Sequence, residues 1–164
     1  MKKLIVGFCL IFGITSYAQC TEEEYLELLE QSVLDEEYGQ FTKDLVKFYT
    51  SEEYMFKKYY DKTFFDKLGA ENVKQGCITP VTAFNDWVKD NLSKTKFTSA
   101  EEAVSLYTNF WKYERITQEF MKRTQPIEDM YKQKYGLVIH HDFMNDLSHV
   151  SFSKFTKFLE ERQP

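Results

Sequence analysis

Apolar residues recur at helical spacing along most of this chain, and the strict alternation typical of half-buried strands is nearly absent. Only six glycines and three prolines interrupt the pattern. Because apolar residues three and four positions apart share one face of a helix, the sequence predicts an all-α protein. We expect a compact single-domain array of about six to eight helices.

Glycines and capping residues predict where the helices of the N-terminal half begin and end. A helix is expected to stop at Gly39, because glycine favours the position just past a helix C-terminus. Thr50 and Glu53 have the spacing of a capping box, so the next helix should begin there and run to Gly69. Residues 69–80 are expected to form a loop.

The C-terminal half predicts one long helix followed by two short ones. Thr98 and Glu101 have capping-box spacing at the start of the long helix. Pro126 is expected to kink or break that helix, because proline lacks the N–H that the helical ladder needs. Residues 140–149 and 151–161 are expected to form the two short helices that complete the fold.

The first eighteen residues have the pattern of a secretory signal peptide rather than of folded structure. Two lysines precede an apolar stretch over residues 4–14, which is too short to span a bilayer. Small residues at Ser16 and Ala18 suit a signal peptidase, so cleavage is expected after Ala18. The mature chain would be a single helical domain of residues 19–164, located in the bacterial periplasm or secreted.

Two cysteines remain once the signal peptide has removed Cys9. An even pair in an exported protein predicts a disulfide, here between Cys20 and Cys77. Closing so long a loop contributes about 4 kcal/mol of stability in the chain-entropy model.

A lipid anchor on Cys20 is the first alternative, and two free thiols are the second. Surface-exported lipoproteins carry a lipidated cysteine at the first mature position, followed by an acidic tag, and the sequence Cys-Thr-Glu-Glu-Glu resembles such a tag. The residues that precede Cys20 fit the lipoprotein pattern poorly, because Tyr17 replaces the usual aliphatic residue and Gln19 the usual small one. Lipidation would also leave Cys77 as an odd thiol. The disulfide is therefore the favoured prediction.

The net charge of the protein narrows the class of partner. The full sequence has a net charge of −5, and removing two lysines with the signal peptide leaves 19 Lys+Arg against 26 Asp+Glu, a net charge of −7. Nucleic-acid binding normally needs a basic face, so no nucleic-acid partner is expected. An acidic surface steers basic partners, so we expect a basic protein partner.

Aromatic residues make up 17% of the sequence and are concentrated in residues 54–65. Three of them form a row with a spacing of four and are expected in the core: Phe56, Tyr60 and Phe64. Tyr54 and Tyr59 lie off that row, and lysines interleave with them. Tyrosine combines a large apolar ring with a polar tip, so Tyr54 and Tyr59 are the predicted partner-binding residues.

All three histidines fall in the segment from His140 to His149. Imidazole and carboxylate groups on one helix face can hold a divalent metal, and four residues have that spacing: His141, Asp142, Asp146 and His149. The pattern is weak, because the sequence has neither a His-Glu-x-x-His nor a Glu-x-x-His motif. A small metal-binding protein or hydrolase built on this segment is the alternative function.

Catalytic motifs are otherwise absent from the sequence. It contains no Gly-rich phosphate loop and no Gly-x-Ser-x-Gly elbow, and we expect no cofactor and no catalytic residues. The sequence therefore favours an exported, non-enzymatic protein that binds another protein, such as an inhibitor or immunity-type factor of the cell envelope. A surface lipoprotein anchored through Cys20 remains the alternative for its location.

Overall fold

The computed structural model of the protein describes residues 36–78 and 80–162. The predicted signal peptide, its cleavage site and Cys20 lie outside these residues. The described residues form helices and no strand, which confirms the predicted all-α class. The six α-helices are α2 (Glu36–Tyr49), α3 (Glu52–Leu68), α4 (Val73–Ile78), α5 (Val81–Asn91), α6 (Ala100–Tyr135) and α7 (Leu137–Glu160), with 3₁₀ turns at Ala70–Asn72 and Leu92–Lys94.

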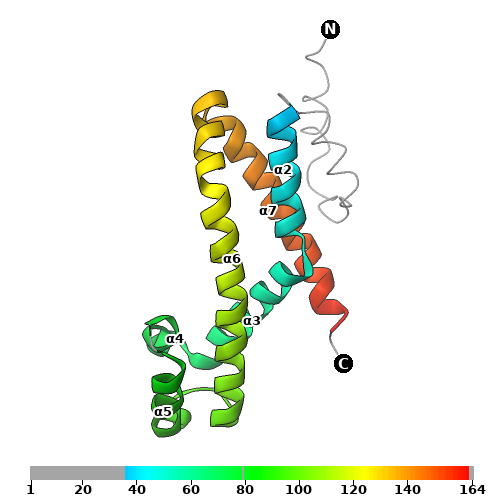
Figure 1. Cartoon of the computed structure of the whole chain (residues 1–164). Coiled ribbons are helices and arrows are strands. Elements are labelled where there is room, and N and C mark those ends of the chain that lie inside the picture. The colour runs from blue at the N-terminus through cyan, green and yellow to red at the C-terminus, as the bar shows by residue number, and fades with distance from the viewer. Residues whose placement is uncertain (1–35, 79, 163–164) are drawn as a thin grey trace.

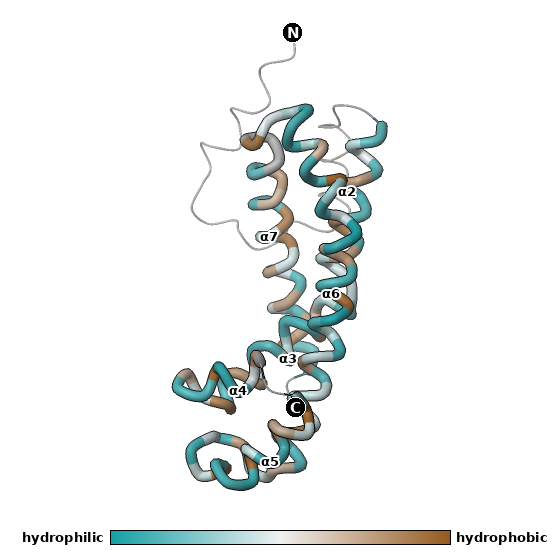
Figure 2. Tube along the Cα trace, turned by 60° about the vertical axis from the view of Figure 1, so that its left-hand side comes forward, coloured by the Kyte–Doolittle hydropathy of each residue, from teal (hydrophilic) through white to brown (hydrophobic). Residues whose placement is uncertain are grey.

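The helices form an elongated array in place of the compact one expected from the sequence (Figure 1). Helix α6 runs the length of the molecule, and α7 turns back alongside it after Gly136. Helix α2 lies beside the C-terminal half of α6, α3 crosses the middle, and α4 and α5 gather at the opposite end (Figures 1 and 2).

Buried residues form three clusters along this array rather than one. Hydrophobic and hydrophilic positions mix along each helix, so each can present an apolar stripe inward (Figure 2). The first cluster joins α2, the C-terminal half of α6 and α7, and it is built around these residues: Tyr38, Phe41, Leu45, Val46, Phe120, Tyr131, Phe143, Leu147 and Val150.

The second cluster fills the opposite end, where α3, α5 and the start of α6 meet. Phe64 is fully buried there, and its ring packs 5.7 Å from the ring of Phe84 and 5.3 Å from that of Phe110, measured between centroids. The third cluster consists of Met55, Phe155 and Phe158, which join the start of α3 to the end of α7. Helices α3 and α6 therefore link the two ends of the molecule.

Two glycines lie just past helix ends, and the sequence predicts the first of them, Gly69. Gly69 follows α3 and Gly136 follows α6, with φ values of 87° and 91° that L-residues rarely adopt. Each donates its backbone N–H to a carbonyl in the preceding turn, Phe65 for Gly69 and Lys132 for Gly136. These hydrogen bonds satisfy carbonyls that a helix C-terminus leaves open.

Two predicted interruptions in the N-terminal half are wrong. Gly39 lies inside α2, because burial of this helix face against α6 and α7 outweighs the roughly 1 kcal/mol helix penalty of glycine. The loop expected over residues 69–80 is mostly helical. It contains a 3₁₀ turn and then α4, whose Gly76 packs against Phe64 and Leu68 of α3.

Two predicted helix breaks in the C-terminal half are also wrong. Helix α6 continues through Pro126 for 36 residues without a break. Buried residues on both sides of the proline, Phe120 and Tyr131, hold the helix against α2 and α7. The expected break between residues 149 and 151 is absent as well, because Val150 and Ser151 are both buried within the continuous helix α7.

Helices α6 and α7 are long enough to cross a bilayer but too polar to do so. The 36 residues of α6 correspond to about 54 Å. Lysines and carboxylates recur along it, for example in the ion pair of Lys132 with Glu128 at 2.5 Å. No helix within residues 36–78 and 80–162 combines the length and the apolar character that a membrane span needs.

Candidate functional site

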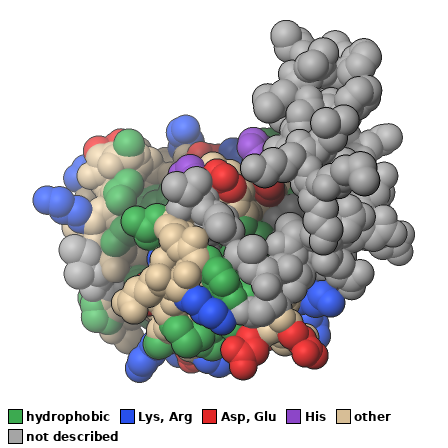
Figure 3. Space-filling view, turned by 90° about the horizontal axis from the view of Figure 1, so that it is seen from above, with side chains coloured by type: hydrophobic (Ala, Val, Ile, Leu, Met, Phe, Trp, Pro, Cys, Tyr) green, Lys and Arg blue, Asp and Glu red, His purple; other side chains and the backbone are tan. Residues whose placement is uncertain are grey.

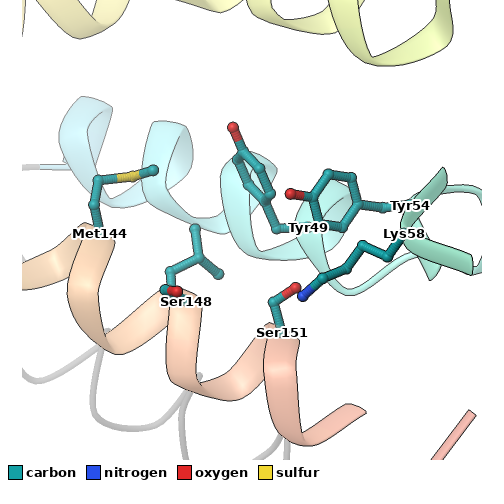
Figure 4. A pocket seen from close by; sticks show the side chains of 7 residues that line it. Tyr49, Tyr54, Lys58, Met144, Ser148 and Ser151 are labelled. Carbon is teal, nitrogen blue, oxygen red and sulfur yellow. The ribbon is translucent and has the colours of Figure 1, made fainter. Parts of the chain in front are cut away.

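A small pocket lies where the end of α2, the start of α3 and the middle of α7 meet (Figure 4). Its volume is about 220 Å³. We call it the Lys58 pocket, and its lining residues are Tyr49, Tyr54, Lys58, Met144, Leu147, Ser148 and Ser151. Leu147 and Met144 make part of its lining apolar, whereas an ammonium group and several hydroxyls make another part polar.

The ammonium of Lys58 is held among aromatic rings. Its Nζ lies 5.2 Å from the ring centroid of Phe155 and 5.9 Å from those of Tyr54 and Phe152. Such cation–π contacts compensate in part for lost hydration. No carboxylate of the described residues lies within ion-pair distance of it. Burial lowers the pKa of Lys58, and the neighbouring Lys57 lowers it further.

Lys57 provides the contrast, because it has two carboxylate partners. It forms an ion pair with Asp61 one turn along α3, and its Nζ lies 3.5 Å from the Oε2 of Glu114 on α6. Burial raises the pKa of Asp61, and the bond with Lys57 opposes that shift. Both carboxylates at this contact between α3 and α6 therefore pair with Lys57. Lys58, in contrast, faces the pocket.

Ser151 brings an unpaired polar group to the same pocket. Its side chain is 3% exposed, and its Oγ has no hydrogen-bond partner among the described residues. A buried hydroxyl without a partner costs about 1–3 kcal/mol of stability. Figure 4 shows Ser151 of α7 and Lys58 of α3 pointing toward each other across the pocket. Two groups that lack polar partners thus converge from different helices.

The two pocket tyrosines form an aromatic wall. Tyr49 and Tyr54 pack edge to face with ring centroids 4.8 Å apart. Burial raises the pKa of Tyr49 to about 12, with smaller contributions from Tyr54 and Glu128, and burial also raises the pKa of Tyr54. Both hydroxyls therefore remain protonated across the physiological range, and the wall carries no negative charge.

Of the two predicted partner-binding residues, Tyr54 and Tyr59, only Tyr54 is among the residues that line this pocket. Tyr59 packs against Phe158 of the third cluster, with ring centroids 6.5 Å apart. Both tyrosines are half-buried, and so are two members of the row expected in the core, Phe56 and Tyr60. Only Phe64 of that row is fully buried. The separation into inward and outward aromatics is thus weaker than the sequence predicts.

The residues of the weak metal prediction lie along one exposed stretch of α7. The His141 and Asp142 side chains are each 73% exposed, and the Nδ1 of His141 lies 3.2 Å from the Asn145 amide. Burial raises the pKa of Asp146, and the nearby His149 opposes this shift. The His140 side chain lies outside the described residues. Within those residues no three His, Cys, Asp or Glu side chains lie close enough together to hold a metal.

The predicted disulfide cannot be followed in the structure, because Cys20 lies outside the described residues. Its proposed partner Cys77 lies in α4, at the end of the molecule away from the Lys58 pocket, and its side chain is exposed. The disulfide and its lipid-anchored alternative both remain predictions.

An exposed aromatic side chain stands at the edge of the Lys58 pocket. Phe152 is 65% exposed although its ring contacts the Lys58 ammonium. Aromatic side chains are enriched at protein interfaces relative to the rest of the surface. On the face seen in Figure 3, acidic and basic side chains are interspersed rather than separated by sign.

Neither Lys58 nor Ser151 could be selected from the sequence as a site residue. Lys58 stands in the aromatic segment that indicates a contact surface, but nothing local distinguishes it from Lys57. Ser151 falls where the sequence predicts a break between two helices. The signal that unites them is their shared lack of a polar partner, which only tertiary structure reveals.

Comparison with known proteins gives no match, whether to family models, to curated proteins or to solved structures. The functional argument therefore depends on the chemistry of the site.

Proposed function

We propose that this protein is an exported, non-enzymatic binding protein whose partner is another protein, as an inhibitor or immunity-type factor of the cell envelope would be. The observation that supports this proposal is the Lys58 pocket with the exposed Phe152 at its edge. A few residues in central pockets carry most of the binding energy of an interface, and aromatic side chains are enriched at such surfaces.

The size of the pocket favours a protein partner over a free cofactor. Sites for drug-sized molecules span about 300–1,000 Å³, and the Lys58 pocket holds about 220 Å³. One side chain of a partner fits a space of this size. Tyr54, one of the two residues that the sequence predicts for binding, lines it and adds aromatic area. The net charge of −7 expected after signal-peptide removal supports a partner that is basic overall.

The test is a photo-crosslinker placed at position 152 of the full-length protein, which is expressed in its native envelope. The crosslinked partner is then identified, purified and titrated against the protein. Phe152→Ala should weaken this binding by about 2 kcal/mol or more, roughly 30-fold in Kd, with an unchanged melting temperature. Binding should also weaken as ionic strength rises, because screening reduces long-range attraction between an acidic protein and a basic partner.

Leu137→Ala is the matched control for this experiment. Leu137 is 69% exposed on the same helix but lies at its far end, away from the Lys58 pocket. Its truncation should leave the affinity unchanged. If position 152 yields no specific crosslink, or if both alanine variants bind equally well, the pocket is not the contact surface and the proposal fails.

A further inference from the structure

The positive charge of Lys58 is the first indication of which chemical group the partner inserts into the pocket. Its neighbour Lys57 is matched by Asp61 and Glu114, whereas Lys58 has aromatic rings around it and no carboxylate within ion-pair distance among the described residues. A half-buried ammonium has lost part of its hydration, and a bound anion would replace it. The pocket therefore offers an unmatched positive charge.

The second indication is the hydroxyl of Ser151, which is buried and has no polar partner among the described residues. It belongs to a different helix from Lys58 and points toward it across the pocket (Figure 4). A carboxylate has two oxygens, so one can accept from the Lys58 ammonium while the other accepts from the Ser151 hydroxyl. One bound group would thus satisfy both residues.

The rest of the pocket lining is the third indication, because it carries few polar groups. Lys58 is the single cation among the residues that line the pocket, which suits an anion of one charge better than a phosphate. Leu147 and Met144 supply an apolar surface, beside the aromatic wall of Tyr49 and Tyr54. A buried apolar cavity of about 150 Å³ accommodates benzene, so the 220 Å³ here accommodate a carboxylate with an apolar stem of several carbons.

We infer that the Lys58 pocket binds a carboxylate on a short apolar stem, held by Lys58 and Ser151 and supplied by the protein partner as a glutamate side chain or as its C-terminal carboxylate. This inference rests on the proposed function, because it names the group that the partner inserts. A basic partner that carries one carboxylate at its contact surface would satisfy both the overall charge of the protein and the local charge of the pocket.

Hexanoate is the probe for the chemistry of the pocket, and binding is followed by NMR titration of the mature protein. Hexanoate should bind saturably with a millimolar Kd, at least tenfold more tightly than the uncharged hexan-1-ol. Lys58→Gln and Ser151→Ala should each weaken hexanoate binding, by tenfold or more for Lys58→Gln. The shifted resonances should belong to residues that line the pocket.

Two further variants make the titration decisive. Lys62→Gln removes an exposed lysine of the same helix that is paired with Asp66, and it should leave hexanoate binding unchanged. Lys58→Arg keeps the positive charge, and this variant should retain hexanoate binding. It provides a second test of the charge if Lys58→Gln fails to fold. Equal binding of hexanoate and hexan-1-ol, or hexanoate binding that survives Lys58→Gln, would overturn the inference.

Competition with the purified partner separates this inference from the proposed function. Displacement of the partner by hexanoate supports the partner as the source of the carboxylate. Hexanoate binding in the pocket without displacement overturns the partner as source and leaves a site for a free monocarboxylate. Partner binding at Phe152 without any hexanoate binding overturns the carboxylate and leaves the proposed function intact.

Discussion

Glu102 shows how a single residue serves a local and a distant contact together. Its backbone N–H donates to the Oγ of Ser99, and its carboxylate accepts from the backbone N–H and hydroxyl of Thr98. The same carboxylate bonds Lys67 of α3. These contacts, with Lys67 the largest, lower its pKa from 4.5 to about 2. The start of α6 is thereby tied to the end of α3.

Glu102→Gln should therefore lower stability in a pH-dependent way. Because the pKa in the folded state is below its ordinary value, the stabilisation is fully present above pH 4.5 and is lost as the pH falls toward 2. We expect a loss of about 1 kcal/mol at pH 7, since the group is partly exposed and screened. Urea unfolding at pH 7 and at pH 3 measures it, with the exposed Glu119→Gln as control. A difference from wild type that is the same at both pH values would contradict this account.

The caps at residues 50–53 and 98–102 also show what sequence can and cannot predict at this scale. Both helix starts are predicted correctly to within one residue, but Ser51 and Ser99 cap the helices in place of the expected threonines. The local sequence offers two equivalent capping boxes, one formed by Thr98 with Glu101 and the other by Ser99 with Glu102. The structure uses Ser99 with Glu102, and in this arrangement Glu102 also contacts Lys67 of α3. Such a tertiary contact cannot be predicted from local sequence spacing.

At the scale of elements, α4 depends on the absence of a side chain at Gly76. A Cβ atom there would lie 2.7 Å from the Cε1 of Phe64 and 2.8 Å from the Cδ2 of Leu68. Both neighbours are fully buried and cannot move aside. Glycine therefore permits the close packing of α4 on α3 in the segment where the sequence predicts a loop.

Gly76→Ala should consequently destabilise the protein by about 1–3 kcal/mol, although alanine normally favours a helix. Thermal unfolding followed by circular dichroism measures the effect. Lys74→Ala, at an exposed position of the same helix, should leave the melting temperature unchanged. A Gly76→Ala variant that melts above wild type would show that α4 does not pack this closely.

Pro126 illustrates why element boundaries are harder to predict than element types. Proline inside a helix costs about 3 kcal/mol, which is reason enough to predict a break. The structure continues through it because the same face of α6 is buried before and after the proline, at Thr124 and Tyr131. Periodicity reveals that face, but it does not reveal that α2 and α7 cover it on both sides.

For the whole molecule, the compartment is the most consequential prediction still to be measured. The protein isolated from its native host should begin at Gln19 and carry a disulfide between Cys20 and Cys77, because an oxidising compartment favours pairing of two cysteines. Intact mass should show the loss of residues 1–18 and of two hydrogens, and reduction should restore the two hydrogens. A diacylglycerol adduct on Cys20 would instead assign the protein to a membrane surface.

The fold class follows from composition and periodicity, whereas the arrangement of the helices does not. The sequence identifies helices α3 and α6, yet it does not show that buried residues divide into separate clusters. The candidate site depends on this arrangement. Lys58 and Ser151 are far apart in the sequence and meet because α7 folds back past the start of α3.

The uninterrupted course of α6 also constrains how this protein tolerates changes in length. Phe110 belongs to the cluster at one end of the molecule and Phe120 to the cluster at the other. Deleting one residue between them would turn one end by about 100° relative to the other and shorten the helix by about 1.5 Å. Substitutions in this stretch alter single contacts, but insertions and deletions would put a whole buried face out of phase with its partners.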